Sequence, residues 1–194
     1  MSMVDLNGTE TQKNLLKAFA GESQARNRYL YAAEVAEAEG YLQIADLFRE
    51  TADNEREHAR RYFSFLKGGE ALEITASYPA GKVGNTLENL KAAAAGELEE
   101  WSELYPKAAD VAKAEGFNDV AAAFSMIARV EKEHEARYRR LLENVEQNRV
   151  FQKETPTRWK CKNCGYVHEG PGAPAKCPAC LKGREQFEVK AENY

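Results

Sequence analysis

The stretch AAEVAEAEGYLQIADLFRETADNEREHARRY (residues 32–62) returns 76 residues later as AADVAKAEGFNDVAAAFSMIARVEKEHEARY (residues 108–138), and 15 of the 31 aligned positions are identical. Within each copy, one set of residues recurs at spacings of four and three, which is typical of a helix that faces the core of a bundle. In the first copy this set is Ile44, Phe48, Thr51, Glu55, His58 and Tyr62. A glycine near the start of each copy, Gly40 or Gly116, marks a short turn. The repeat therefore predicts two similar helical hairpins that face each other across an approximate twofold axis.

The pattern continues on both sides of the repeat and predicts an all-α four-helix bundle. Ala, Leu, Glu, Lys and Arg, which favour helices, dominate the first 150 residues. The turns at the two glycines are short, whereas residues 68–84 are too many for a tight turn and indicate a crossover along the bundle. Pro106 is expected to kink the third helix. The expected helices span residues 9–38, 41–67, 85–114 and 118–148.

The last 40 residues differ from the rest of the chain in charge and composition. Residues 155–194 hold seven Lys/Arg and four Asp/Glu, a net charge of about +3, which leaves −7 for residues 1–154 because the whole chain carries −4. All four cysteines also lie in this segment. We place a domain boundary near Glu154, beside the turn signal Thr155–Pro156, and expect a small, mainly β or loop domain after it.

The overall composition predicts a soluble, cytoplasmic protein. Apolar residues make up 43% of the chain and charged residues 30%, which is typical of a globular domain. No apolar run is long enough to span a bilayer, and the stretch from Met1 to Glu10 lacks the features of a signal peptide. The negative net charge gives no general attraction to nucleic acid or to an anionic membrane.

Charged residues interrupt the apolar faces of the predicted helices at matching positions of the repeat. Each copy carries Glu-x-x-His, and one further glutamate follows the apolar residues of each remaining helix. A carboxylate in an apolar core costs several kcal/mol unless it is paired or bound to metal. The alternative is surface charge plus two core histidines. The matched pattern favours a site for two iron or manganese ions. Its candidate ligands are Glu22, Glu55, His58, Glu97, Glu131 and His134.

One carboxylate breaks the symmetry of the repeat. Glu100 lies three residues after Glu97, on the same helix face, whereas its counterpart in the first half is Ala25. Glu100 is either ordinary surface charge, as we expect for Glu99 and Glu103, or a seventh ligand that lets one metal ion change partners. The second reading is the hypothesis we carry forward.

The cysteines follow the pattern C-x2-C-x12-C-x2-C, which predicts a four-thiolate metal site. Disulfides are the alternative, and the reducing cytosol disfavours them. The spacing alone leaves iron and zinc both open. His168 is not needed, because four thiolates complete a tetrahedron. Trp159, Tyr166 and Phe187 are expected to form the small core. The proposed ligands are Cys161, Cys164, Cys177 and Cys180.

These motifs together resemble the rubrerythrin family over essentially the whole chain. The matching strings are AFAGESQARNRY (18–29), ETADNEREHARR (50–61), AAAGELEEW (93–101), EKEH (131–134), WKCKNCGYVHEG (159–170) and CPAC (177–180). The resemblance implies a ferritin-like di-iron bundle followed by a rubredoxin-like domain with one iron, for which zinc can substitute in recombinant material. It also implies a peroxidase that reduces hydrogen peroxide to water and protects against oxidative stress.

The family resemblance assigns roles to individual residues. It implies that the six candidate ligands and Glu100 serve the di-iron site, with His58 exchanging against Glu100 as the iron oxidation state changes. Tyr29 and Tyr105 are implied to hydrogen-bond ligand carboxylates. One departure from rubredoxins is Leu181, which stands after the second cysteine pair where glycine is usual. That difference puts one N–H···S bond in doubt.

The implied partners are hydrogen peroxide and an external electron donor, either rubredoxin or an NAD(P)H-dependent reductase. A homo-oligomer, at least a dimer, is expected, because the four-thiolate site lies far along the chain from the di-iron site. The main alternative is a ferritin-like iron-binding or ferroxidase protein whose tail is a structural zinc ribbon. A zinc-ribbon binding module is a third reading, and the small charge of the tail argues against it.

Overall fold

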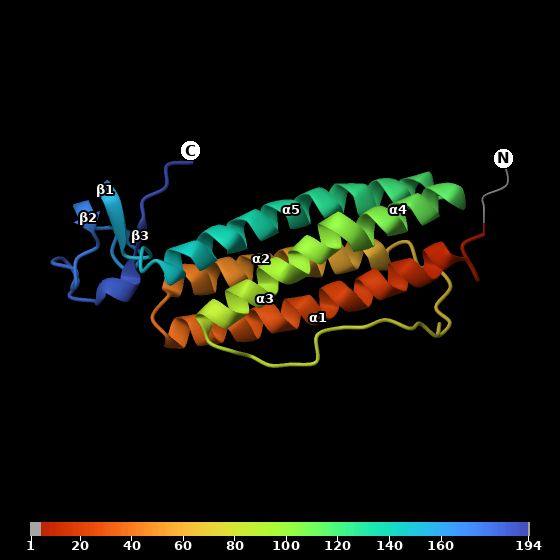
Figure 1. The fold of residues 1–194 in the computed structure, drawn as a ribbon, viewed down its shortest axis with the longest axis horizontal. Helices are drawn as coiled ribbons and strands as arrows, with labels where there is room; N and C mark the ends of the chain where they lie inside the picture. The colour runs from red at the N-terminus through yellow and green to blue at the C-terminus, as the bar shows by residue number, and fades with distance from the viewer. Residues whose placement is uncertain (1–4, 194) are drawn as a thin grey trace.

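The structure, a computed structural model, describes residues 5–193 and contains a helical bundle followed by a small β domain (Figure 1). The first hairpin pairs α1 with α2, and the second pairs a longer rod, formed by α3, η1 and α4, with α5. The predicted fold class is confirmed. The helices are α1 (Glu10–Ala38), α2 (Leu42–Phe63), α3 (Thr86–Glu99), the π-helix η1 (Glu100–Leu104), α4 (Tyr105–Ala114) and α5 (Asn118–Glu146).

The segment between α2 and α3 runs along the outside of the bundle beside α1 (Figure 1). The prediction that the second helix reaches residue 67 is wrong, because α2 ends at Phe63. After that residue the chain tightens: the N–H of Phe65 donates to the carbonyl of Tyr62 and the N–H of Leu66 to that of Phe63. Such i→i+3 bonds satisfy orphan carbonyls at a helix end. The apolar spacing that predicted a helix up to residue 67 therefore extends into this turn, beyond the end of α2.

The predicted third helix is interrupted by a π-helical segment. Instead of a simple kink at Pro106, η1 precedes the proline, and the N–H of Tyr105 donates to the carbonyl of Glu100. The repeat explains why: Glu22 and Glu97 are 75 residues apart, whereas Tyr29 and Tyr105 are 76 apart. One additional residue must fit between Glu97 and Tyr105, and a π turn absorbs it without ending the helix.

The two hairpins cap each other at repeat-related positions, a feature that sequence reasoning missed. The Glu115 carboxylate, in the α4–α5 turn, accepts hydrogen bonds from the backbone N–H and hydroxyl of Thr11 at 2.9 and 2.6 Å. The Glu39 carboxylate, after α1, accepts one from the N–H of Thr86 at 3.1 Å. Each glutamate thus satisfies orphan donors at the start of a helix in the other hairpin.

The C-terminal domain contains an antiparallel three-stranded sheet in the order β2-β1-β3. Its strands are β1 (Gln152–Cys161), β2 (Val167–Gly172) and β3 (Phe187–Val189), with the short helix η2 (Arg184–Gln186) before the last strand. Trp159 and Phe187 are buried, and Tyr166 packs against them. This small core lies beside the cysteines. The boundary near Glu154 stays a prediction.

The C-terminal domain lies at the end of the bundle that carries the α1–α2 turn (Figure 1). Tyr41, in that turn, stacks on Phe151 with ring centroids 6.2 Å apart. Lys162 of the tail forms an ion pair with Asp46 of α2. The tail therefore does not fold back along the bundle. Within residues 5–193, no helix is both long and apolar enough to cross a membrane.

Candidate metal centres

The Glu-x-x-His motifs meet in the middle of the bundle and form two overlapping groups of potential ligands. One contains Glu22 and His58 and the other contains Glu97 and His134, while Glu55 and Glu131 belong to both. Ligand atoms within each group lie within 4.8 Å of one another. Two shared carboxylates between two histidines are what a pair of bridged metal ions requires. All six predicted ligands are brought together, and we call this set of residues the ligand layer: Glu22, Glu55, His58, Glu97, Glu131 and His134.

The two groups have nearly the same geometry because the repeat places them around one axis. Nδ1 of His58 lies 2.8 Å from a Glu55 oxygen and 2.9 Å from a Glu131 oxygen. Nδ1 of His134 lies 3.2 and 2.8 Å from the other oxygens of the same two carboxylates. The imidazole rings lie 6.0 Å apart, centroid to centroid. Each shared carboxylate therefore faces both histidines, one oxygen to each.

The buried oxygens of this cluster lack enough protein partners, which fits a site built for cations. Atoms of all four buried glutamates have no hydrogen-bond partner of good geometry among the described residues, and neither does Nδ1 of His134. Burial, followed by the charges of nearby glutamates, raises the pKa of Glu22 well above its usual value. An apolar core does not otherwise hold four such carboxylates, because mutual repulsion and desolvation are both unfavourable. The donor set of oxygens and two imidazoles suits iron.

The negative charge of the glutamates also raises the pKa values of the two histidines, and so favours their protonated form. Burial alone would lower the pKa of His58, but the carboxylates of Glu131 and Glu55 raise it to about 9. Burial likewise opposes protonation of His134, and the surrounding carboxylates raise the pKa of that imidazole to about 12. Without metal, protons on the imidazoles compensate part of the negative charge. Metal binding must displace them, so it releases protons.

Glu100 belongs to neither ligand group. It is half-buried in the π-helical segment. Burial raises the pKa of its carboxyl first, and the charges of Glu97, Glu131 and Glu55 raise it further, so the side chain lies close to the cluster. The π turn places this carboxylate at the edge of the site, whereas its counterpart, Ala25, lies in the apolar core. The structure thus has His58 inside the cluster and Glu100 beside it.

Both predicted tyrosines contact the carboxylates across the bundle. The Tyr29 hydroxyl donates to Glu97 and the Tyr105 hydroxyl to Glu22, each at 2.5 Å. Each tyrosine belongs to an aromatic cluster that closes one end of the site. The rings of Tyr29, Phe48 and Tyr138 pack at one end, and their repeat counterparts Tyr105, Phe124 and Tyr62 pack at the other. Both clusters place aromatic rings beside the ligand carboxylates.

Asn54 is a site residue that sequence reasoning missed. Its side-chain oxygen lies 3.2 Å from Nε2 of His134, so this nitrogen is held on the side of the ring away from the glutamates. The counterpart of Asn54 in the repeat is Val130, which has no such group. Among the described residues, Nε2 of His58 has no hydrogen-bond partner. No sequence signal pairs Asn54 with His134, since the contact joins two different hairpins.

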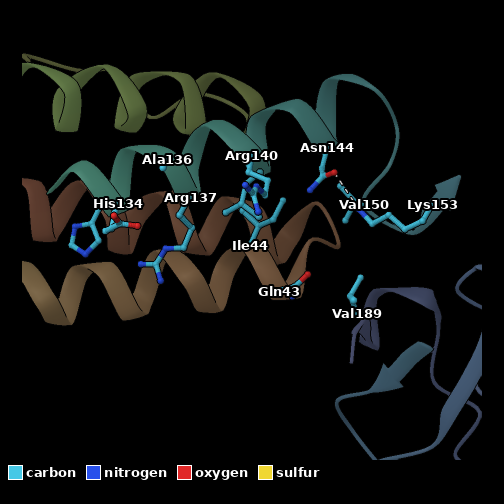
Figure 2. A pocket seen from close by; sticks show the side chains of 12 residues that line it. Gln43, Ile44, His134, Ala136, Arg137, Arg140, Asn144, Val150, Lys153 and Val189 are labelled. Atoms are coloured by element: carbon cyan, nitrogen blue, oxygen red, sulfur yellow. Dashed lines mark hydrogen bonds between the residues drawn. The ribbon is translucent and has the colours of Figure 1, made fainter. Parts of the chain in front are cut away.

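A groove of about 540 Å³ opens beside His134 and extends toward the C-terminal domain. Figure 2 shows Arg137 and Arg140 of α5 along this groove, with Lys153 and Val189 at its far end. Arg137 donates to the Thr51 hydroxyl at 2.7 Å. The groove near His134 thus carries arginine side chains together with Glu133, and Arg137 also pairs with Glu50 at 2.6 Å.

The four cysteine sulfurs of the tail also converge within 4.8 Å and form no disulfide. The backbone N–H of Lys182 stabilises the thiolate of Cys180 and lowers its pKa to about 6. Leu181 adopts a left-handed φ of 62°, close to the 79° of Gly165 after the first pair. The second turn therefore has a conformation close to that of the first, although leucine replaces the usual glycine. His168 does not join the cluster.

Comparisons with known proteins agree with this arrangement. A family model described as rubrerythrin matches residues 13–142, and one described as the rubrerythrin rubredoxin-like domain matches residues 159–188. Rubrerythrin-1 of Clostridium acetobutylicum is 57% identical over 99% of this chain and 100% of its own length. Rubrerythrin of Nitratidesulfovibrio vulgaris is 51% identical over the same shares of the two chains.

Solved structures give the same architecture. Fully reduced, all-ferrous nigerythrin superposes with a TM-score of 0.64 at 28% identity, covering 97% of this chain and 90% of that one. A bacterioferritin of Desulfovibrio desulfuricans, described with a diiron site, superposes with a TM-score of 0.63 at 23% identity, covering 72% and 82% of the two chains. The second likeness shows the fold alone.

Proposed function

This chain belongs to the rubrerythrin family, and we propose that it is a non-haem di-iron peroxidase that reduces hydrogen peroxide to water. The observation that carries the proposal is the pair of ligand groups that share Glu55 and Glu131. The cofactors are two iron ions in the bundle and one iron in the tail. When bound, the iron pair supplies the two electrons that break the O–O bond.

The glutamates and histidines divide into three roles in this proposal. Glu55 and Glu131 would hold both ions, since each carboxylate faces both histidines. Glu22 and Glu97 each hold one ion and are fixed by the hydroxyls of Tyr105 and Tyr29. Hydrogen bonds of this kind orient a ligand and tune its basicity. His58 would complete the ligand group of one ion, and His134 that of the other.

With iron bound, His58 would be the ligand that exchanges with Glu100. Loss of two electrons raises the positive charge of the site, so an anionic carboxylate is then preferred over a neutral imidazole. Reduction reverses the preference. Two observations support His58 as the mobile ring: its Nε2 has no partner in the described structure, and the side chain is 12% exposed, against 5% for His134. Asn54 holds His134 in place.

The tail supplies electrons one at a time. Its four cysteines form a tetrathiolate site, and Cys164 is exposed at the surface, where a donor can approach. The external donor, rubredoxin or an NAD(P)H-dependent reductase, is part of the proposal. A route within one chain is long: 12 residues separate His134 from the end of α5 at Glu146. At 1.5 Å per residue that is roughly 18 Å before the linker begins.

The distance favours a homo-oligomer in which electrons pass between chains. In a head-to-tail dimer, the tail of one chain can lie against the bundle of its partner. The opposite net charges of the two domains favour such docking. The position of the tail at the end of its own bundle supports this route, since that tail cannot also lie beside its own ligand layer.

Anaerobic reconstitution with ferrous iron, followed by a peroxide-turnover assay, tests the activity. The expected result is about three iron ions per chain, visible charge-transfer bands from the ferric tetrathiolate site, and consumption of hydrogen peroxide at the expense of a rubredoxin-type donor. Iron in both sites without peroxide consumption contradicts the proposal. A tail that accepts only zinc contradicts the electron relay.

Mixed dimers test transfer between chains. Cys161→Ser removes the relay site and Glu55→Ala removes the bundle site, so neither variant is active alone. The two are unfolded and refolded together with iron. Recovered turnover in the mixed dimer supports transfer between chains. If mixed dimers form and retain their metals without activity, transfer between chains is wrong.

A further inference from the structure

A second cavity, of about 340 Å³, lies between α1 and the π-helical segment, beneath the crossover. It is separate from the groove in Figure 2, which opens between α2 and α5 on another face. Thr75–Pro79 of the crossover form its roof, and the Tyr78 hydroxyl fastens that roof by donating to the carbonyl of Lys17 at 2.8 Å. Glu100 and Tyr105 line its inner wall. The cavity therefore reaches the edge of the di-iron site from outside.

The lining of this cavity combines polar and apolar side chains. Gln24 and Arg28 belong to it together with Glu100, and Arg28 is close enough to that carboxylate to lower its pKa against the larger effect of burial. The apolar part of the wall comes from α1, the crossover, η1, α4 and α5. Its members are Ala18, Ala76, Pro79, Leu104, Ala108 and Phe124. This part of the wall can cover a hydrocarbon group, while the polar groups beside Glu100 can contact oxygen atoms of the same ligand.

The volume is far larger than hydrogen peroxide needs. A water molecule occupies about 30 Å³ in the liquid, and hydrogen peroxide has only one more oxygen atom. Cavities of about 300 Å³ and above hold small organic ligands. Space is kept open by a glycine: a Cβ built on Gly96 meets no atom within 4 Å. Since glycine inside a helix is destabilising relative to alanine, the open floor is maintained at a cost in stability.

We propose that this cavity binds the organic group of an alkyl or aryl hydroperoxide, with the peroxide oxygens directed toward Glu100. The inference rests on the proposed peroxidase function and extends its substrate class. In the reaction the O–O bond breaks, one oxygen leaves as water and the other stays on carbon as an alcohol. The two electrons come from the reduced di-iron site, and two protons come from solvent. Arg28 and Gln24 would contact the peroxide oxygens together with Glu100, and the apolar part of the wall would cover the hydrocarbon.

The test compares cumene hydroperoxide with hydrogen peroxide on the iron-loaded protein. Gly96→Leu fills the cavity, and Ala95→Leu adds the same side chain at the exposed neighbouring position as a matched control. We expect Gly96→Leu to lower the ratio of the two kcat/KM values, organic to hydrogen peroxide, at least tenfold. We expect Ala95→Leu to leave it within twofold. Gly96→Ala, which favours the helix, should give a smaller fall in the ratio and so covers the case in which the leucine variant fails to fold.

Binding is measured separately from turnover. Calorimetric titration of the oxidised protein with cumyl alcohol, the reduced product, should show binding that Gly96→Leu abolishes and Ala95→Leu retains. Reduction of hydrogen peroxide without reduction of cumene hydroperoxide overturns this inference and leaves the proposed function standing. An unchanged ratio in Gly96→Leu, or no binding of the alcohol, also overturns it. Failure to reduce either peroxide contradicts the peroxidase proposal itself, and the substrate inference with it.

Discussion

The first hairpin and the second share half their residues in the repeated stretch, yet they differ where the chemistry needs a difference. Both contribute one glutamate and one Glu-x-x-His to the ligand layer. The second has an additional residue, accommodated as η1, and with it Glu100. The first has Asn54, which holds the histidine of the other hairpin. Symmetry thus builds the site, and two local departures from symmetry give its ends different freedom.

The largest effect is expected from removal of Glu55 or Glu131, the carboxylates that both ligand groups share. Glu55→Ala and Glu131→Ala should each lose both metal ions, since each carboxylate faces both histidines. The loss of metal affinity should exceed the roughly 10–100-fold that a partner outside the ligand set costs. Metal analysis after desalting measures it. The matched controls are Glu57→Ala and Glu133→Ala, repeat-related and exposed, which should retain metal. Retention of one ion in either test variant would show that the carboxylate does not bridge.

Removal of the metal should destabilise both hairpins together. A ligand present at about 1,000 times its dissociation constant stabilises a protein by about 4 kcal/mol. For a chain of this size that corresponds to roughly 8–16 °C in Tm. Thermal melts of the iron-loaded and chelator-treated protein measure the shift. Equal midpoints would mean that the buried carboxylates are not a metal site.

Glu100→Ala should make the second hairpin resemble the first at this position without emptying the site. Both bundle ions should stay, because the residue lies outside the two ligand groups. Turnover should fall about tenfold, the effect of ~1.4 kcal/mol on a barrier. Iron content and peroxide kinetics check both parts, with the exposed Glu103→Ala as control. Loss of an ion, or full activity, would remove Glu100 from its proposed role.

The difference between Asn54 in the first hairpin and Val130 at the matching position of the second can be tested by substitution in both directions. Asn54→Val gives His134 the surroundings that His58 has, and should cost about 1 kcal/mol of stability through the lost hydrogen bond. Val130→Asn offers His58 a new partner and should slow turnover about threefold by resisting ligand exchange. Melting curves and peroxide kinetics measure these effects. Faster turnover in Val130→Asn would contradict the idea that His58 must move.

The smallest effect is expected at Glu115 and Glu39, the glutamates that each cap the start of a helix in the other hairpin. Glu115→Ala should cost about 0.5 kcal/mol, and Glu39→Ala less, because Glu115 accepts more hydrogen bonds. Hydrogen bonds from Thr11 lower the pKa of Glu115 below its usual 4.5. Its contribution is therefore present above pH 4.5 and is lost as the pH falls through the lowered pKa. The difference in Tm between Glu115→Ala and the unaltered protein should narrow below pH 4.5. A difference independent of pH would exclude the carboxylate as its source.

The repeat and the helical spacing were enough to predict the bundle and the six residues of the ligand layer. Both depend on short-range periodicity, which decides the helix face on which each side chain lies. The π turn was visible only as a change of offset from 75 to 76, which does not say where a helix widens. Asn54 and Glu115 act across hairpins, the latter over 104 residues, and no spacing rule connects such distant positions. The left-handed conformation of Leu181 could not be read from a residue type that usually avoids it.

The additional residue in η1 also bears on how such a chain could arise. A single hairpin that paired with an identical copy would assemble the same four glutamates and two histidines, with two equivalent ends. Any residue inserted into that ancestor would appear twice, so Glu100 would stand at both ends. Joining two copies in one gene removes this constraint, since each copy then mutates alone. Fusion would therefore permit the proposed exchange, in which one metal ion changes ligands while its neighbour keeps them.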